Sequence, residues 1–178
     1  MIENEENLIN KAKLGDSASF GKLYDAYLPG IYRFIFLKIG QKEEAEDLAH
    51  QVFLSAWQNI PSYEVKNTPF GSWLYRIARN KVIDTYRLSR SFVDLETVEA
   101  ELADKRNLAE ETDQSMTMSK VIQALHSLPS EHQDVLIMRF IEDLPIKEVA
   151  LALKKSIGAV KLIQFRALHK LKKILENK

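Results

Sequence analysis

The sequence predicts an all-α fold of two small helical domains joined by a flexible acidic linker. Apolar residues recur at helical spacing along most of the chain, and no stretch alternates as a β-strand would. A length of 178 residues allows one ordinary domain or two small ones. Over residues 94–113 the periodic pattern weakens and the net charge is −6. We therefore expect domains at 1–90 and 114–178, with a linker at 91–113.

In the first domain, a helix is predicted to begin after Asp16, whose carboxylate can cap it. Pro29 allows a bend in the apolar series that follows, and Gly40 ends that series. Another helix is expected over about 42–59, where apolar residues face inward, and Pro61 ends it.

The last helix of the first domain is predicted to start at Thr68 and Pro69, a capping residue followed by proline at the first helical position. It should run to about Leu88. This helix is amphipathic, with an apolar stripe that we expect to be buried and a polar side. The stripe holds Phe70, Trp73, Leu74, Ile77, Ala78 and Val82, and the polar side holds Arg76, Arg79, Asn80, Lys81, Asp84 and Arg87.

The second domain is predicted to open with a helix from near Gln114 to Leu128. Ser130 and Gln133 then have the spacing of a capping box, which predicts the start of the next helix. That helix carries apolar residues as far as Phe140.

Residues 145–175 have the proportions of a helix–turn–helix. A short helix over 145–153 is followed by a break at 154–156 and a longer helix over 157–175. The turn and the second helix concentrate basic residues, as a recognition helix that meets phosphates requires. A basic amphipathic helix that closes a small bundle is the structural alternative. The basic residues are Lys154, Lys155, Lys161, Arg166, Lys170 and Lys172.

The formal net charge of zero hides an uneven distribution. Residues 61–93 carry a net charge of +4 and residues 154–178 carry +7, whereas residues 1–60 carry −3. Two basic segments separated by an acidic one indicate a nucleic-acid partner more clearly than the overall charge does.

Several classes of protein are excluded or disfavoured. The chain has no cysteine, which excludes disulfides, thiolate metal sites and a cysteine nucleophile. It has no membrane-spanning apolar run, phosphate-binding glycine loop or nucleophile elbow. His50 lies four residues after Glu46, which is half of a metal site, but the other histidines lack partner spacing. We therefore expect no catalytic residue, metal or cofactor.

Two stretches of the first domain carry further information. Residues 43–57 combine acidic side chains in the first helical turn with an apolar face; a well-capped solvated helix is the alternative. Residues 70–87 interleave aromatic with cationic side chains, the combination that binds single-stranded nucleic acid. The alternative for the aromatic residues is a core position, which we expect for Phe70 and Trp73.

The chain resembles an extracytoplasmic-function (group 4) sigma factor of the sigma-70 family. LYDAYLPGIYRFIFLKIG at 23–40 is similar to the start of sigma region 2. AEDLAHQVFLSAW at 45–57 is similar to its polymerase-binding segment, and FGSWLYRIARNKVIDTYR at 70–87 to its promoter-melting segment. Residues 128–153 together with GAVKLIQFRAL at 158–168 are similar to region 4.

This resemblance implies a role in transcription initiation. The partners would be core RNA polymerase, through its β′ clamp helices and β flap, promoter duplex, and the melted non-template strand. An anti-sigma factor is a further implied partner. The location would be the bacterial cytoplasm, where an anti-sigma factor could hold the protein at the membrane without its inserting there.

The resemblance also assigns residues to three sites. A flipped −10 base would be captured by the loop 61–68. The polymerase set is Glu46, Asp47, His50 and Gln51, with Phe53 and Trp57 as packing support; the −10 set is Tyr63, Lys66, Asn67, Arg76, Arg79, Asn80 and Arg87; and the −35 set is Lys155, Ser156, Gly158, Ala159, Lys161, Gln164 and Arg166.

The chain departs from the usual pattern of such proteins at two places. His50 and Gln51 stand where many relatives have glutamine and an acidic residue, and Ala159, Leu162 and Ile163 replace threonine, serine and arginine. The second departure concerns the −35 sequence preference.

The rival function is a helix–turn–helix regulator that does not engage polymerase.

A linker of ~24 residues spans about 27 Å, which permits the two domains to close on each other.

Overall fold

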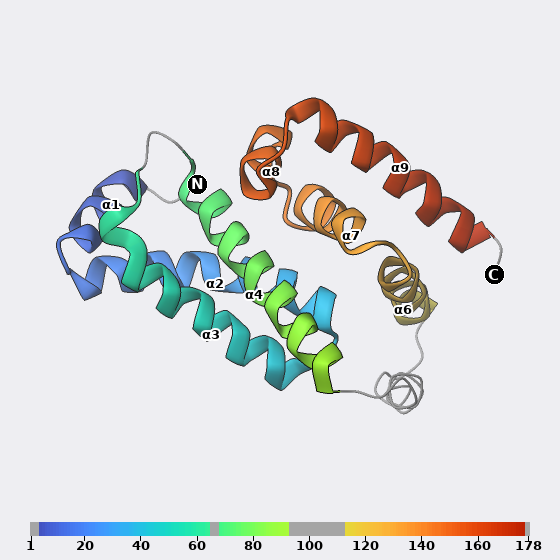
Figure 1. Ribbon diagram of the computed structural model, residues 1–178, viewed down its shortest axis with the longest axis horizontal. Coiled ribbons are helices and arrows are strands. Elements are labelled where there is room, and N and C mark those ends of the chain that lie inside the picture. The colour runs from blue at the N-terminus through green and yellow to red at the C-terminus, as the bar shows by residue number, and fades with distance from the viewer. Residues whose placement is uncertain (1–3, 65–67, 93–112, 177–178) are drawn as a thin grey trace.

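The computed structural model describes residues 4–64, 68–92 and 113–176, and in this part of the chain every element is helical. Four helices and a short 3₁₀ turn precede the linker segment (Figure 1), and their buried apolar residues belong to a core that continues into the second half. These elements are α1 (Glu5–Lys13), α2 (Ser17–Ile39), α3 (Lys42–Asn59), η1 (Ile60–Ser62) and α4 (Phe70–Phe92).

The helix limits of this first half follow from local signals. Asp16 accepts a hydrogen bond from the amide of Ala18 and so caps α2, as predicted. Gly40 ends the helix with a φ of 77°, a left-handed conformation that glycine adopts without strain. Pro29 lies inside α2, which continues through it as one helix. The helix α4 extends to Phe92, four residues beyond the predicted end.

The helix α1 was not predicted. Its polar sequence, EENLINKAK, contains only two positions that are fully buried, Ile9 and Ala12. Both positions lie against the core, and Tyr27 donates a 2.5 Å hydrogen bond from α2 to the carboxylate of Glu5. Tertiary contacts, rather than a strong apolar stripe, therefore hold this helix in place.

The described part of the second half, residues 113–176, contains four helices and a π-helical turn. The π turn joins α7 to the loop before α8, within the segment predicted to be one continuous helix. The helix α9 packs against α6, α7 and α8. These elements are α6 (Asp113–His126), α7 (Ser130–Leu136), η2 (Ile137–Ile141), α8 (Ile146–Leu153) and α9 (Ile157–Glu176).

The predicted capping box at the start of α7 is wrong. Pro129 occupies the N-cap position, and no side chain caps the helix. The Gln133 amide instead donates hydrogen bonds to the carbonyl oxygens of Leu128 and His126. The Ser130 hydroxyl accepts a 2.9 Å hydrogen bond from Lys38 of α2, so Ser130 is used in a tertiary contact and Gln133 in bonds to the segment just before α7.

The helix–turn–helix is formed by α8 and α9, as predicted. Lys154 makes the turn in a left-handed conformation, with a φ of 54°, and Ser156 caps α9 by accepting from the amide of Ala159. Val160 and Ala167 are fully buried against the rest of the second half. Leu168, the next residue after Ala167, is 40% exposed.

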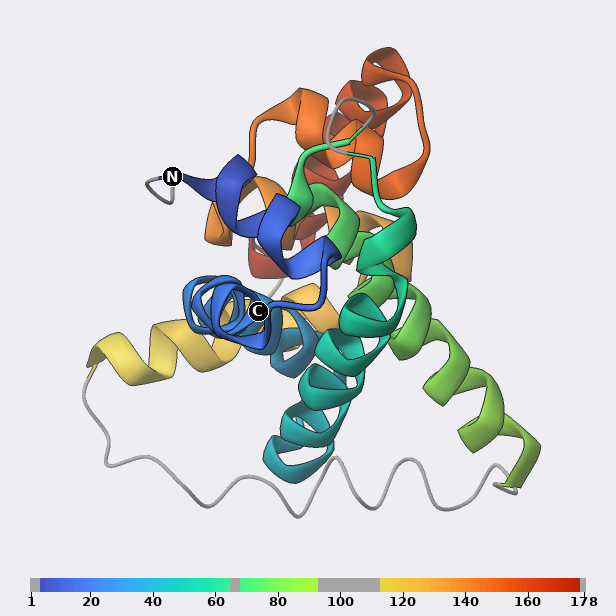
Figure 2. The same ribbon diagram turned by 90° about the vertical axis from the view of Figure 1, so that its left-hand side faces the viewer.

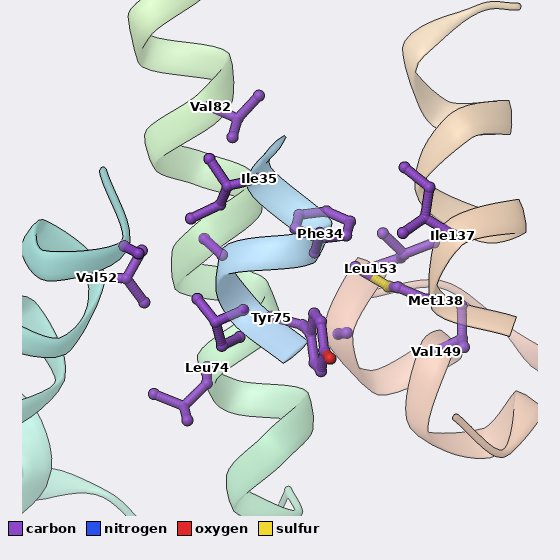
Figure 3. Close-up of a cluster of buried hydrophobic side chains, with 14 of the residues drawn as sticks. Phe34, Ile35, Val52, Leu74, Tyr75, Val82, Ile137, Met138, Val149 and Leu153 are labelled. Carbon is purple, nitrogen blue, oxygen red and sulfur yellow. The ribbon is translucent and has the colours of Figure 1, made fainter. Parts of the chain in front are cut away.

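The two halves pack against each other through α4 and α8 and through α2 and η2. Figure 3 shows Phe34 and Tyr75 of the first half beside Met138, Val149 and Leu153 of the second. All five side chains are buried. The two halves are therefore closed on each other in this structure, and Figure 2 shows the second half beside the first.

Candidate polymerase and nucleic-acid interfaces

The outer face of α3 is acidic and exposed. The predicted polymerase set divides by burial: Glu46, Asp47, His50 and Gln51 are exposed, whereas Phe53 is buried. The ring of Phe53 packs edge-on against Tyr24, with centroids 4.7 Å apart, and Trp57 packs similarly against Phe20. The Tyr24 hydroxyl lies 3.3 Å from His50 Nδ1. The two aromatic residues thus fix the helix that presents the acidic side chains.

A hollow of about 350 Å³ lies between the C-terminal end of α3, η1 and α4. Tyr63 lines it and is itself buried, and its hydroxyl donates a 2.5 Å hydrogen bond to the carbonyl oxygen of Thr68. Burial raises the pKa of Tyr63 to about 12. Lys66 and Asn67 lie outside the described residues. The hollow is lined by Ser55, Asn59, Ser62, Tyr63, Trp73, Ile77, Asn80, Lys81 and Asp84.

Some residues on the cationic side of α4 are exposed to solvent, and others contact the second half. Asn80 and Arg87 are exposed. Arg76 and Arg79 instead contact the second half: Arg76 donates to the carbonyl oxygen of Leu151 at 2.6 Å, and Arg79 Nε lies 2.7 Å from Asp134. Two of the seven predicted −10 residues are therefore held in contacts between the halves.

Asp134 is the centre of a buried charge network between the halves. Its side chain has no exposed surface and pairs with Arg79 and with Lys38, which is 1% exposed. Lys38 also donates to the hydroxyl and carbonyl oxygens of Ser130, at 2.9 and 3.2 Å. Burial lowers the pKa of Lys38, and the adjacent Asp134 carboxylate opposes that shift.

A second ion pair joins the halves nearer the surface. Arg33 binds Glu142 through two nitrogens, at 2.6 and 2.8 Å, and the Tyr75 hydroxyl donates to the same carboxylate at 3.1 Å. Gly30 makes this contact possible, because a Cβ atom there would lie 2.7 Å from the Tyr75 hydroxyl.

The recognition helix α9 presents its cations to solvent. Lys161 and Arg166 are exposed, and neither has an ion pair or hydrogen bond among the described residues. Of the rest of the predicted −35 set, Gly158 is exposed and Ala159 half-buried, while the oxygen of Ser156 serves as the helix cap.

Two members of the −35 set are less available than expected. Lys155 pairs with Glu131 at 2.8 Å. Gln164 is half-buried, and its side-chain oxygen is fully buried without a hydrogen-bond partner among the described residues. The exposed positions of the same helix include Leu162 and Phe165, which the sequence analysis did not assign to DNA.

Lys38 and Asp134 were not predicted to have a role. For Lys38 a signal was present, because it falls in the apolar series of Ile31, Phe34 and Ile35 at helical spacing. A lysine in such a series requires a buried partner. Nothing local in the sequence identifies that partner as Asp134, which lies 96 residues away.

No helix in the described part of the chain is long and apolar enough to cross a membrane. Nor do the described residues contain a group of three or more His, Asp or Glu side chains placed to hold a metal ion.

Comparisons with known proteins agree with this geometry. Residues 23–91 match the family model for sigma-70 region 2, and residues 124–173 match that for sigma-70 region 4. The chain is 33% identical to the ECF RNA polymerase sigma factor BldN of Streptomyces coelicolor over 96% of its own length, and it spans 65% of that protein. It is 31% identical to the ECF RNA polymerase sigma factor SigW of Bacillus subtilis over 95% of each chain.

Solved structures share the fold. CnrH, solved in complex with the cytosolic domain of CnrY, superposes with a TM-score of 0.77 at 22% identity over 99% of each chain. The sigma factor RpoE of Bartonella quintana, solved with the anti-sigma factor NepR, gives 0.68 at 21% identity, over 88% of this chain and 96% of RpoE.

Both halves therefore have the architecture of sigma-70 promoter-recognition domains. The chain belongs to the ECF RNA polymerase sigma factors of the sigma-70 family. The family membership favours a role in transcription initiation over the rival interpretation as a helix–turn–helix regulator independent of polymerase.

Proposed function

We propose that this protein binds core RNA polymerase, directs it to promoters through −35 and −10 elements, and helps to melt the DNA. One observation carries the proposal: an exposed acidic helix face on α3 and an exposed cationic recognition helix, α9, lie on opposite sides of one chain (Figure 1). A simple operator-binding protein has use for α9 but not for the α3 face and the hollow beside it.

The first half, residues 1–90, would supply the polymerase contact. Glu46 and Asp47 point outward on α3 and suit the basic surface of a protein partner, which we take to be the β′ clamp helices. His50 and Gln51 extend the same face, and region 4 would reach the β flap. In this division, residues 91–113 connect the first half to the −35-binding half, 114–178.

The hollow between α3 and α4 would hold a base flipped out of the −10 element. Its volume of about 350 Å³, the half-buried Trp73 and the polar groups of Asn80 and Asp84 suit a nucleobase that needs stacking and hydrogen bonds. Arg87 and, once released from the second half, Arg76 and Arg79 would hold the adjacent phosphates.

The helix α9 would lie in the major groove of the −35 element, with Lys161 and Arg166 against phosphates or guanine. No chemical step is assigned to the protein itself, since the polymerase performs catalysis. We place the protein in the bacterial cytoplasm. RpoE is bound by an anti-sigma factor, and we propose a partner of that class here, able to hold the protein at a membrane.

Run-off transcription with purified core polymerase on a genomic promoter library tests the proposal. We expect specific start sites that core polymerase alone does not produce. A chain that binds DNA but never yields such starts, in the absence of an inhibitor, would be the rival regulator instead.

Charge variants test whether the α3 face binds polymerase and the α9 face binds DNA. Glu46→Lys combined with Asp47→Lys should weaken association with core polymerase and leave −35 binding unchanged. Lys161→Ala and Arg166→Ala should weaken promoter binding and leave core association unchanged. If all of these variants lose core binding, the assignment of the faces is wrong.

A further inference from the structure

The second half supplies binding partners for two cations of the predicted −10 surface. The carboxylate of Asp134 accepts a 2.7 Å hydrogen bond from Arg79 Nε. The carbonyl oxygen of Leu151, in the last turn of α8, accepts a 2.6 Å hydrogen bond from Arg76. A carboxylate and the C-terminal end of a helix both present negative charge to a guanidinium group, as a DNA phosphate does. The second half therefore occupies groups with which this part of α4 would bind DNA.

Both arginines lie at a buried contact between α4 and α8. The side chain of Arg79 is only 25% exposed, and the Nε atom of Arg76 is fully buried. Buried apolar side chains pack beside them, from Tyr75 of α4 and from Val149 and Leu153 of α8 (Figure 3). A DNA strand therefore cannot bind both arginines until the two helices separate.

The spacing of the two promoter elements gives a second reason for separation. Leu151, which contacts Arg76, lies six residues before Ile157, where α9 begins. Six residues span at most about 22 Å, and a helix of the length of α9 adds about 30 Å. Elements centred at −35 and −10 lie about 25 base pairs apart, which is roughly 85 Å of B-DNA. The closed chain therefore cannot place α9 and this part of α4 on both elements of one promoter.

We propose that contacts between the halves make the free protein autoinhibited for −10 DNA, with Asp134 and the C-terminal end of α8 as the inhibiting groups. The proposal rests on the function proposed above, because it requires α4 to bind the −10 element. It adds a regulatory step, in which α4 becomes available only when the halves separate. A partner that binds the separated form better than the closed form promotes this step, and core polymerase is the partner expected to do so.

The test measures binding of the free full-length chain to single-stranded −10 DNA, without polymerase. The probe is a fluorescent oligonucleotide with the non-template −10 sequence of a promoter found in the run-off experiment. Gly30→Ala opens the halves without altering any charge, because its Cβ atom would lie 2.7 Å from the Tyr75 hydroxyl and 3.0 Å from Glu142. Gly21→Ala is the matched control in the same helix, since a Cβ atom there would have no neighbour within 4 Å.

We expect Gly30→Ala to bind the probe more tightly than the unmodified protein does, and Gly21→Ala to bind it as weakly as the unmodified protein. The apparent affinity rises with the fraction of open chains, and overpacking of the interface raises that fraction about fivefold or more. Arg79→Ala, added to Gly30→Ala, should reverse much of the gain, because the released cation is then missing.

Asp134→Ala provides an independent route to the open chain. It removes the partner of Arg79 and leaves Lys38 as a buried cation without its carboxylate. Asp25→Ala removes the same charge from an exposed position and should gain no affinity for the probe. Circular dichroism checks that each variant is folded, and small-angle scattering checks that Gly30→Ala and Asp134→Ala are expanded relative to their controls.

The outcomes separate this inference from the function on which it rests. Holoenzyme that never yields specific starts would contradict the proposed function. Holoenzyme that initiates normally, while the free unmodified protein binds the −10 strand as tightly as the two open variants, would overturn the autoinhibition alone. Open variants that gain no affinity for the probe would overturn it too, and so would an equal gain in the Gly21→Ala or Asp25→Ala control.

Discussion

The cationic faces of α4 and α9 differ in how available they are. On α4, Arg76 and Arg79 are bound by the carbonyl oxygen of Leu151 and by Asp134, both from the second half. On α9, Lys161 and Arg166 are free of such contacts among the described residues. In the closed structure, therefore, these two cations of the predicted −35 surface are open, and part of the predicted −10 surface is occupied. We expect α9 to meet DNA without rearrangement and α4 to do so only after the halves separate.

The largest effect is expected from Asp134→Ala. The substitution leaves Lys38 as a buried cation without its carboxylate, and loss of one partner of a buried pair costs about 3–5 kcal/mol. Separation of the halves returns Lys38 to water, so we expect an open chain rather than an unfolded one. Small-angle scattering should report a larger radius of gyration, while circular dichroism should be unchanged.

Asp25→Ala is the matched control for this change, because it removes an exposed carboxylate from the first half. It should stay as compact as the unmodified protein. If Asp134→Ala is equally compact, the charge network does not hold the halves together.

The next largest effect is expected from Gly30→Ala. Its new Cβ atom would lie 2.7 Å from the Tyr75 hydroxyl and 3.0 Å from Glu142, which forces the interface to shift. Overpacking of this kind costs about 1–3 kcal/mol. Tyr75→Phe removes the nearer of the two clashing atoms, so the double variant should recover part of the lost closure, as scattering can measure. Two effects that simply add would contradict this explanation.

A smaller effect is expected from Arg33→Ala. The variant removes a bidentate contact to the almost fully buried Glu142, but Arg33 itself is half-exposed, which limits the expected loss to about 1 kcal/mol. The variant should open at lower urea concentration than the unmodified protein. Lys42→Ala, which breaks an exposed pair with Glu46 at 3.9 Å, should leave the opening midpoint in place.

The smallest expected effect is a pH dependence of closure. Burial, with a contribution from Lys38, lowers the pKa of His126 below 6.5 in the closed structure. The separated halves therefore bind more protons between that lowered value and 6.5, and closure should strengthen as the pH rises through this window. Above it, the dependence should flatten.

His126→Gln should abolish this slope. Burial raises the pKa of Glu148, so closure favours its protonated carboxyl group. At lower pH, closure should therefore weaken as the pH rises through the range in which Glu148 titrates. The comparison is therefore made in a Glu148→Gln background. A slope that persists without His126 would assign the effect to another group.

Most of the fold could be predicted from the sequence, because its signals are local. Asp16 and Gly40 each fix a helix end through short-range geometry. The helix α1 could not be predicted, since its few buried positions are stabilised by contacts with α2. The failed capping box has a related cause: Ser130 binds Lys38 of α2, and Gln133 binds carbonyl oxygens of the segment just before α7.

The candidate sites likewise contain features that local patterns predict and features that depend on long-range contacts. The exposed cations of α9 follow from helical periodicity, and so does the acidic face of α3. The engagement of Arg79 by Asp134 depends on contact between residues 55 positions apart, so periodicity alone could not reveal it. Leu162 and Phe165 are visible in the sequence as apolar residues, but only the folded helix shows that they are exposed.

Energy transfer between the two halves tests the central claim most directly. The chain has no cysteine, so dyes can be attached at Leu14→Cys, in the exposed turn before α2, and at Lys173→Cys on α9. We predict efficient transfer in the free protein and a marked fall when core polymerase and promoter DNA are added and run-off transcripts appear. Unchanged transfer under conditions that yield transcripts would contradict the account, because α4 would then act without release from the second half.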